Sequence, residues 1–282
     1  MKFGLYRVLG NDLPMRHNPE QTEKNTKFIL EQENLPEHCK SAYILNRIAD
    51  EEKLWRLKKL IEKQGYSWID IPFKRHEYEQ FTLDAERAHY LTNVNSARNL
   101  AISHGITKYD VTVVLDGAAY FRADGWTPFE DLAYEFQEDA AYAIPVHRAS
   151  SFEEIQSVSF EPQIRECYEF QRGYKVYGVR EPYLAFRPFI DIRFKEDQIY
   201  GKADKAELLY RLGLAGVWDR FEPQLRDAAL ERKSKFFGTV KMAGYCIRLP
   251  DHVLPGDESN KVRSQLRSKG LVALIESLKK GS

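Results

Sequence analysis

The sequence predicts an α/β protein in which helices flank a mainly parallel sheet, followed by an irregular α+β C-terminal part. Five runs in the first half are rich in Val, Ile and Tyr and mostly lack strict alternation of apolar and polar residues. That pattern is typical of strands that are covered on both faces, as in parallel sheets. Amphipathic stretches separate these runs, as crossover connections require. After residue 150 the alternation becomes less regular.

The five predicted strands are residues 2–9, 41–48, 67–73, 111–117 and 141–148. We expect a helix within residues 18–35, with Asn18 as its N-cap and Pro19 at the first helical position. A second helix within residues 50–65 presents one apolar face. A third helix is expected at about residues 95–104, with Asn93 or Asn95 as its N-cap.

The second half is expected to complete the domain that residues 1–150 begin. Residues 176–188 resemble one or two strands, residues 238–253 a hairpin or a strand followed by a loop, and residues 258–280 a basic helix. A short helix follows Asp204, which we expect to act as its N-cap. We therefore treat residues 151–282 as part of one domain.

Charge and cysteine content exclude several classes of protein. The chain has 282 residues, and its 42 Lys and Arg balance 42 Asp and Glu, so its net charge does not indicate binding to nucleic acid or to an anionic membrane. The three cysteines form no C-x-x-C pair, which indicates reduced thiols rather than a zinc site or a disulfide framework. Neither a signal peptide nor a run of ~20 apolar residues is present, so we expect a cytoplasmic protein without a membrane span.

Polar residues follow three of the predicted strands. They are Asn11 with Asp12, Asn46 with Arg47, and Asp116 with Gly117. Parallel strands end at the same edge of a sheet, and open α/β sheets bind ligands at that edge. The sequence therefore predicts one ligand site at the carboxyl ends of the strands.

Asp116 is the leading candidate in this site, since it ends an otherwise buried strand. The alternative is that Asp116 only turns the chain, with Gly117 in a left-handed conformation. Arg98 and Asn99 lie on the preceding predicted helix and are expected near the same edge. Arg98 is suited either to bidentate binding of a carboxylate or pyrophosphate or to a structural salt bridge with Asp116.

The segments V-N-S-A-R-N-L-A-I-S-H-G (94–105) and V-V-L-D-G-A (113–118) resemble a passage of GT-A-fold, nucleotide-sugar-dependent glycosyltransferases, a Rossmann-related architecture. The opening Y-R-V-L-G-N-D, with Arg7 and Asn11, is similar to the first nucleotide-contacting strand of that family. The resemblance implies that residues 1–150 bind the nucleotide sugar and residues 151–282 face the acceptor. It also implies that Arg98 frames the nucleotide.

A divalent cation, Mn²⁺ or Mg²⁺, is a further implication of the resemblance. Asp116 would bind the metal, and His252 stands where many members place a C-terminal histidine at the metal or the diphosphate. The sequence departs from the family at Ala118, where a second acid is usual. Basic side chains are an alternative means of neutralising the diphosphate, and from Arg226 onward 12 Lys and Arg stand against 6 Asp and Glu.

The second half supplies the remaining candidates. Lys205 stands at the start of an apolar stripe that continues through Leu208, and a lysine on such a face needs an anionic partner unless its ammonium group reaches solvent. Transfer with inversion needs a general base for the acceptor hydroxyl, and we expect a partly buried carboxylate in that role. Transfer with retention, which needs no such base, is the alternative. The candidates are Glu181, Asp191 and Glu207, with Glu181 preferred.

The sequence therefore favours a hexosyl- or pentosyltransferase that moves a sugar from a nucleotide-diphosphate sugar, for example a UDP-sugar, to a hydroxyl acceptor. Polysaccharide, glycan or a modified base in DNA are all possible acceptors. Two alternatives stay open. One is a nucleotidyltransferase-like enzyme, which would usually have a glycine-rich loop with a lysine after the first strand. The other is a non-catalytic protein of the same fold, which Ala118 favours.

Overall fold

The computed structural model describes residues 1–157, 175–177, 181–201, 204–216, 223–242, 244–250 and 260–280. Its strands are β1 (Phe3–Leu9), β2 (Cys39–Asn46), β3 (Ser67–Ile71), β4 (Val111–Asp116), β5 (Ala119–Tyr120), β6 (Ala141–Ile144), β7 (Val146–Arg148), β8 (Lys175–Tyr177), β9 (Tyr183–Phe186), β10 (Leu214–Gly216), β11 (Lys241–Met242) and β12 (Cys246–Arg248). Its helices are α1 (Gln21–Gln32), α2 (Glu51–Lys63), α3 (Arg75–Gln80), α4 (Asp84–Thr92), α5 (Val94–Gly105), α6 (Ala123–Glu135), α7 (Phe152–Ser157), α8 (Ala206–Arg211), α9 (Pro223–Glu231) and α10 (Asn260–Lys280).

Seven of the described strands form the central sheet, in the order β11-β6-β9-β4-β1-β2-β3. β1 pairs in parallel with β2 and β4, and β2 pairs in parallel with β3. β9 is antiparallel to both of its neighbours, β4 and β6. The predicted α/β class with a mainly parallel sheet is confirmed, and so is the less regular α+β character of the second half.

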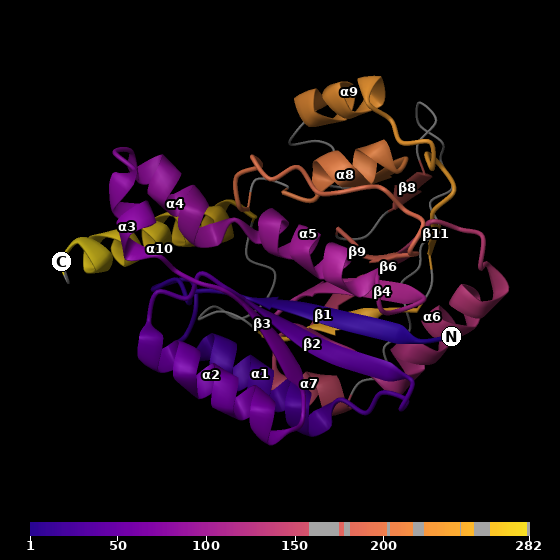
Figure 1. Cartoon of the computed structure of the whole chain (residues 1–282), viewed down its shortest axis with the longest axis horizontal. Helices are drawn as coiled ribbons and strands as arrows, with labels where there is room; N and C mark the ends of the chain where they lie inside the picture. Colours follow the sequence, from indigo (N-terminus) through magenta and orange to yellow (C-terminus); the bar gives the residue numbers. More distant parts are fainter. Residues whose placement is uncertain are drawn as a thin grey trace.

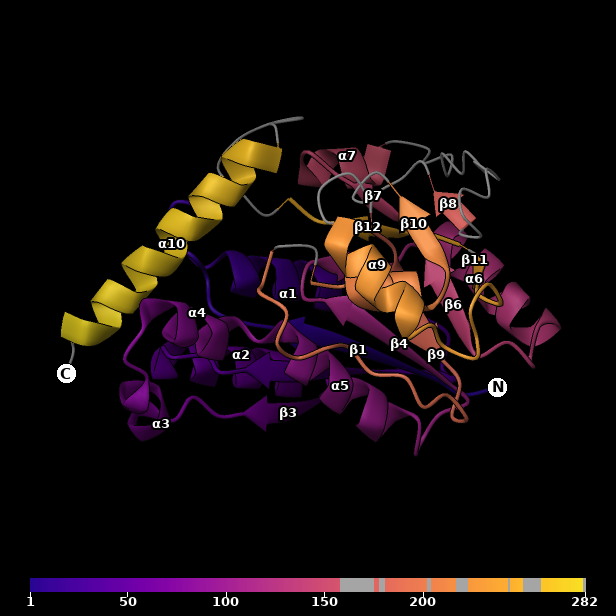
Figure 2. The same ribbon diagram turned by 90° about the horizontal axis from the view of Figure 1, so that it is seen from above.

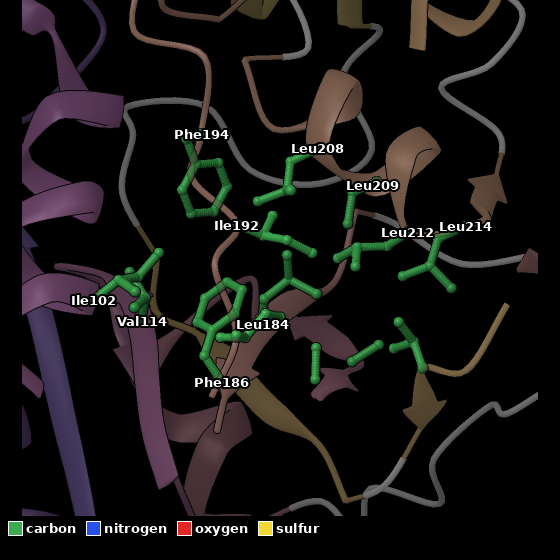
Figure 3. Close-up of a cluster of buried hydrophobic side chains, with 14 of the residues drawn as sticks. Ile102, Val114, Leu184, Phe186, Ile192, Phe194, Leu208, Leu209, Leu212 and Leu214 are labelled. Carbon is green, nitrogen blue, oxygen red and sulfur yellow. The ribbon is translucent and has the colours of Figure 1, made fainter. Parts of the chain in front are cut away.

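Both faces of the sheet are covered, which explains why its strands lack alternation. α5 lies on one side, while α1 and α2 lie on the other (Figure 1). On β4, Val114 belongs to the apolar cluster that includes α5 and α8, whereas Val113 and Leu115 belong to the cluster that includes α6. Figure 3 shows the first of these clusters, in which Leu184 and Phe186 of β9 lie between Val114 with Ile102 on one side and the leucines of α8 on the other.

Of the three helix N-caps predicted from the sequence, one is confirmed and two are wrong. The Asn93 side chain accepts a hydrogen bond from the Ser96 backbone N–H, so Asn93 is the N-cap of α5. The predicted N-cap at Asn18 is wrong, because α1 begins at Gln21 and Glu20 takes a left-handed conformation at φ 59°. Asp204 is also not a cap: α8 begins after Lys205, and the Asp204 carboxylate pairs with an arginine of α5 instead.

α10 lies beyond the carboxyl ends of β1 and β2, and Figure 2 shows it crossing that end of the molecule. Its Gly270 approaches the turn after β1, where an added Cβ would lie 2.5 Å from the Pro14 carbonyl oxygen. Arg267 donates a hydrogen bond to the Gly201 carbonyl at 2.8 Å. α10 therefore borders the edge of the sheet at which the predicted site lies.

Within the described ranges, each helix is too short or too polar to cross a bilayer.

Gly125 gives a test of packing between α6 and the segment that leads into β12. A Cβ at position 125 would lie 2.3 Å from the Tyr245 carbonyl oxygen, which is backbone and cannot move aside without shifting the chain. We expect Gly125→Ala to lower the free energy of unfolding by roughly 1–3 kcal/mol, as overpacking does. Urea denaturation measures this change. Gly10→Ala is the matched control, because no atom lies within 4 Å of its added Cβ, and equal losses in the two variants would contradict the packing argument.

Candidate active site

The carboxyl ends of β1, β2 and β4 meet at one edge of the sheet. Val8 of β1 is in register with Asp116 of β4, and Leu9 of β1 is in register with Leu45 of β2. Because these three strands are adjacent and parallel, the residues that follow them lie side by side. The structure thus brings the three predicted polar strand ends together at one edge.

Arg98 of α5 joins Asp116 to the second half of the chain. Its Nη2 lies 2.8 Å from Oδ1 of Asp116, and its Nη1 lies 2.5 Å from Oδ2 of Asp204. Nη1 also donates to Oδ1 of Asn95 at 2.7 Å. Arg98 is only 3% exposed. The salt bridge that was one of its two predicted roles is therefore present, and it has a second carboxylate that the sequence did not indicate.

Asp116 uses its other carboxylate oxygen as well. The Tyr183 hydroxyl donates a hydrogen bond to Oδ2 at 3.2 Å, and a guanidinium nitrogen of Arg248 lies 3.6 Å from the same oxygen. Burial alone would raise the pKa of Asp116, but the charge of Arg98 and two further cations holds that pKa well below its ordinary range. Asp116 is therefore a carboxylate at neutral pH.

The lowered pKa of Asp116 predicts a sensitivity to acid. A carboxyl group whose pKa is lower in the folded state stabilises the protein above its unfolded pKa of about 3.9, and this contribution is lost as the pH falls through the folded pKa. We expect Asp116→Asn to be less stable than the unmodified protein by roughly 1–3 kcal/mol at pH 7. The difference should shrink as the pH falls below about 4.

Urea denaturation of both proteins between pH 7 and pH 2.5 measures this change. The matched control is Asp131→Asn, on the exposed face of α6 and outside this set of contacts. A stability difference between Asp116→Asn and the unmodified protein that stays constant over the whole pH range would contradict the assignment.

Lys205 and Glu181 lie beside this ion-pair network. The Lys205 ammonium donates to the Pro182 carbonyl at 3.4 Å and lies 4.3 Å from the centroid of the Tyr183 ring, and the residue is 7% exposed. Burial is the largest influence on Glu181 and raises its pKa, and the positive charge of Lys205 opposes that shift. A partly buried carboxyl group with a raised pKa next to a buried ammonium is suited to act as a proton acceptor.

We refer to six side chains as the charge cluster. They are Arg98, Asp116, Glu181, Asp204, Lys205 and Arg248. Three are cations and three are acids, and they come from both halves of the chain. The structure therefore builds a charged site at the predicted edge, where Asp116 is its centre.

The other two strand ends are held by hydrogen bonds among themselves. Asn11 donates to the Arg47 carbonyl at 2.8 Å and accepts from the Ala49 backbone N–H at 2.9 Å. Arg47 takes a left-handed conformation at φ 46° and donates to Oδ1 of Asn46 at 3.0 Å. Strained backbone of this kind is common at functional sites. Asn11, Asn46 and Arg47 thus shape the edge next to the charge cluster.

A cavity of about 320 Å³ opens beside Asn11. It lies between the β1–α1 connection, the start of α2 and the C-terminal half of α10. Asp12, Glu23 and Asp50 are among its lining carboxylates, and Lys53 is paired with Asp12 at 2.9 Å. This lining suits uncharged hydroxyl and amide groups better than phosphate, since excess carboxylates repel anions.

Two of the predicted cofactor-binding residues, Arg7 and Asn99, have structural contacts away from Asp116. Arg7 is fully buried within β1, where it pairs with Glu33 and donates to the Ala119 carbonyl, so the predicted cofactor contact is wrong for this enclosed side chain. Asn99 is tied to both backbone groups of Phe194. The two Asn99 bonds hold the chain after β9 onto α5.

Asp191 and Glu207, the other two candidates for the general base, make no contact with Asp116 among the described interactions. β9 is antiparallel to β4, with Phe186 opposite Thr112, so the chain leaves β9 at the amino end of β4. Asp191 is exposed a few residues further on. Glu207 is paired with Arg211 of its own helix. His252 lies outside the described residues.

Tyr183, Asp204 and Arg248 are the members of the site that sequence reasoning missed. Tyr183 was not among the predicted site residues, and Asp204 was predicted to be a helix N-cap. The Arg98–Asp204 pair spans 106 positions, so no local pattern carries it. The charge excess after Arg226 was the only signal for Arg248.

The described donor set does not fit a divalent metal. A hard cation needs several oxygen ligands, of which proteins usually supply two or more carboxylates or carbonyls. Among the described residues no group of three His, Cys, Asp or Glu side chains is arranged to hold a metal ion. Both oxygens of Asp116 face cationic or hydroxyl donors. Arg98, Tyr183 and Arg248 therefore lie at the carboxylate oxygens that a metal ion would need.

The chain resembles several solved structures at low sequence identity. One is S. aureus TarS 1–349 in complex with UDP, with a TM-score of 0.45 and 13% identity, covering 96% of this chain and 71% of that chain. Another is the mannosyltransferase PcManGT from Pyrobaculum calidifontis in complex with GDP-Man and Mn²⁺, with a TM-score of 0.40 and 13% identity, covering 77% and 54%.

A third similar structure is the M. tuberculosis glucosyl-3-phosphoglycerate synthase, with a TM-score of 0.38 and 10% identity, covering 96% of this chain and 80% of that chain. No protein-family model and no curated protein matches the sequence. At TM-scores of 0.38 to 0.45 and identities of 10 to 13%, these likenesses assign neither a family nor an activity to this chain.

Proposed function

We propose that this chain is a glycosyltransferase that moves a sugar from a nucleotide-diphosphate sugar to a hydroxyl acceptor. The observation that carries the proposal is the charge cluster. It sets Arg98, Lys205 and Arg248 beside Asp116 at the carboxyl edge of a parallel sheet. Arg98 is shared by Asp116 and Asp204, so Lys205 and Arg248 are the cations placed to meet a ligand with several negative charges, and a diphosphate is the ligand class that this edge commonly binds.

The two parts of the donor would meet different surroundings. The diphosphate faces the cations of the charge cluster, whereas the cavity beside Asn11 has room for an uncharged nucleoside or sugar. β1 and β4 are neighbours in the sheet, so the cavity and the cluster are on adjacent strand ends. Binding both parts would fix the sugar between the diphosphate and the acceptor.

Glu181 is the proposed general base. It accepts the proton of the acceptor hydroxyl as the acceptor oxygen bonds to the anomeric carbon. The bond between that carbon and the diphosphate oxygen breaks, and its electron pair stays on the departing nucleoside diphosphate. Lys205 and Arg248 stabilise the charge that develops there. This displacement inverts the configuration at the anomeric carbon.

The experiment is a donor screen. UDP- and GDP-sugars are incubated with the protein with and without Mn²⁺, and release of nucleoside diphosphate and thermal stabilisation are both measured. We expect stabilisation by at least one donor and slow release of its diphosphate. The variant Lys205→Met lacks one of the proposed diphosphate-binding cations and should lose both signals. Absence of both signals for every donor would favour the non-catalytic alternative.

A further inference from the structure

The surroundings of Asp116 bear on how a diphosphate is neutralised. A carboxylate oxygen that already meets a cationic group is a poor ligand for a metal ion, because the two positive charges repel each other. Here Oδ1 accepts from Arg98 at 2.8 Å, and Oδ2 accepts from Tyr183 at 3.2 Å and lies 3.6 Å from a guanidinium nitrogen of Arg248. A divalent ion at Oδ1 would compete with a guanidinium group that is itself held by Asp204 and Asn95, and one at Oδ2 would meet the charge of Arg248.

Position 118 gives a second, independent observation. Ala118 packs against an apolar cluster that includes Ile29, Tyr120 and Ile247. Its carbonyl accepts a hydrogen bond from the Leu249 backbone N–H at 2.8 Å. A carboxylate at position 118 would therefore enter apolar surroundings, which is costly for a charged group. Position 118 thus packs a small apolar side chain where a second metal ligand would be needed.

Lys205 gives a third observation. An ammonium group has three N–H donors, and in the described part of the chain the ammonium of Lys205 donates only to the Pro182 carbonyl, at 3.4 Å. It also lies over the Tyr183 ring, next to the oxygen that bonds Asp116. Such a group is almost fully enclosed and has donors in reserve. It is suited to accept phosphate oxygens as partners.

We infer that fixed side-chain cations, Lys205 and Arg248 aligned by Asp116, neutralise the diphosphate of the donor in place of a divalent metal. The inference rests on the proposed function, because it concerns the same site and ligand. It assigns Asp116 the part of a positioning residue, which holds Arg98 and Arg248 in place and does not touch a metal. Binding and departure of the diphosphate are then independent of Mn²⁺ and Mg²⁺.

The test measures binding of UDP, GDP and inorganic pyrophosphate by calorimetry, in EDTA and again in Mn²⁺. We expect affinities in the two conditions to agree within about threefold, a difference of less than 1 kcal/mol. Lys205→Met and Arg248→Met should each weaken binding by roughly 10- to 100-fold, the worth of one charged hydrogen bond. Lys235→Met, an exposed lysine beside Phe236, is the matched control and should bind as the unmodified protein does.

Direct binding of Mn²⁺ is followed by electron paramagnetic resonance, with and without nucleotide, and we expect that adding the protein leaves each of the two spectra unchanged. Binding or turnover that requires Mn²⁺ would overturn the inference and leave the proposed glycosyl transfer standing. Binding that is independent of metal but unchanged in Lys205→Met and Arg248→Met would overturn it as well. If none of the three probes binds in either condition and no nucleotide sugar is turned over, the inference and the proposed function both fail.

Discussion

Replacing Arg98 with methionine is expected to lower the free energy of unfolding by roughly 3–5 kcal/mol, as removal of one partner from a buried ion pair does. The reason is that Asp116 and Asp204 lose their shared cation while both remain enclosed. Such a loss is a large part of the total stability of a typical domain, about 5–15 kcal/mol. Urea denaturation at pH 7 measures it.

The control for this variant is an arginine pair on the surface. Arg56 of α2 forms an ion pair with Glu23 at 2.9 Å, but its side chain is 34% exposed. Arg56→Met should therefore cost less than about 1 kcal/mol. Arg98→Lys should lie between the two methionine variants, because it restores the charge without the fork that reaches both acids. A cost for Arg98→Met no larger than that for Arg56→Met would mean that Arg98 does not hold the charge cluster together.

The second large effect is expected in Glu181→Gln, where catalysis and stability should move differently. Removing a general base typically lowers the turnover rate by 10²- to 10⁴-fold. Stability should not fall with it. Burial raises the pKa of Glu181, so the folded state favours its neutral form, and its contribution to stability is present at low pH and is lost as the pH rises through the raised pKa. Above that pKa the neutral glutamine should leave the protein at least as stable as the unmodified chain.

Two measurements check the Glu181 assignment. The turnover rate of the unmodified protein should fall as the pH drops through the raised pKa, and Glu181→Gln should lack this dependence. Glu231→Gln, at the exposed end of α9, is the matched control and should keep both rate and pH profile. A stability loss in Glu181→Gln with an unchanged rate would indicate a structural residue and would remove the proposed base.

Patterns within one segment predicted much of this fold. The runs of Val, Ile and Tyr located β1 to β4 because parallel strands are buried on both faces, and Asn93 was available as a cap next to its helix. α6 was missed because it contains Gly125 and Pro128, which weaken a helical pattern. α3 was missed because six residues are too few to show periodicity.

The residues of the site also differ in how far the sequence could predict them. Its edge was predictable, because the ends of parallel strands must meet, and Asp116 with Arg98 followed from that rule. Asp204 and Tyr183 were not predictable as site residues, since each is joined to the edge by a contact between distant segments. Arg7 shows the opposite error: its place in the opening strand was correct, but its side chain turns into the layer beside Glu33.

Arg98 binds one acid from each half of the chain, Asp116 before residue 150 and Asp204 after it. Cutting the polypeptide between the two acids would leave Asp204 without its counter-ion in the second fragment, whereas Arg98 would keep Asp116 in the first. The first fragment would also lose β9, which lies between β4 and β6 in the central sheet. We therefore expect that residues 1–150 expressed alone do not form an independent folding unit.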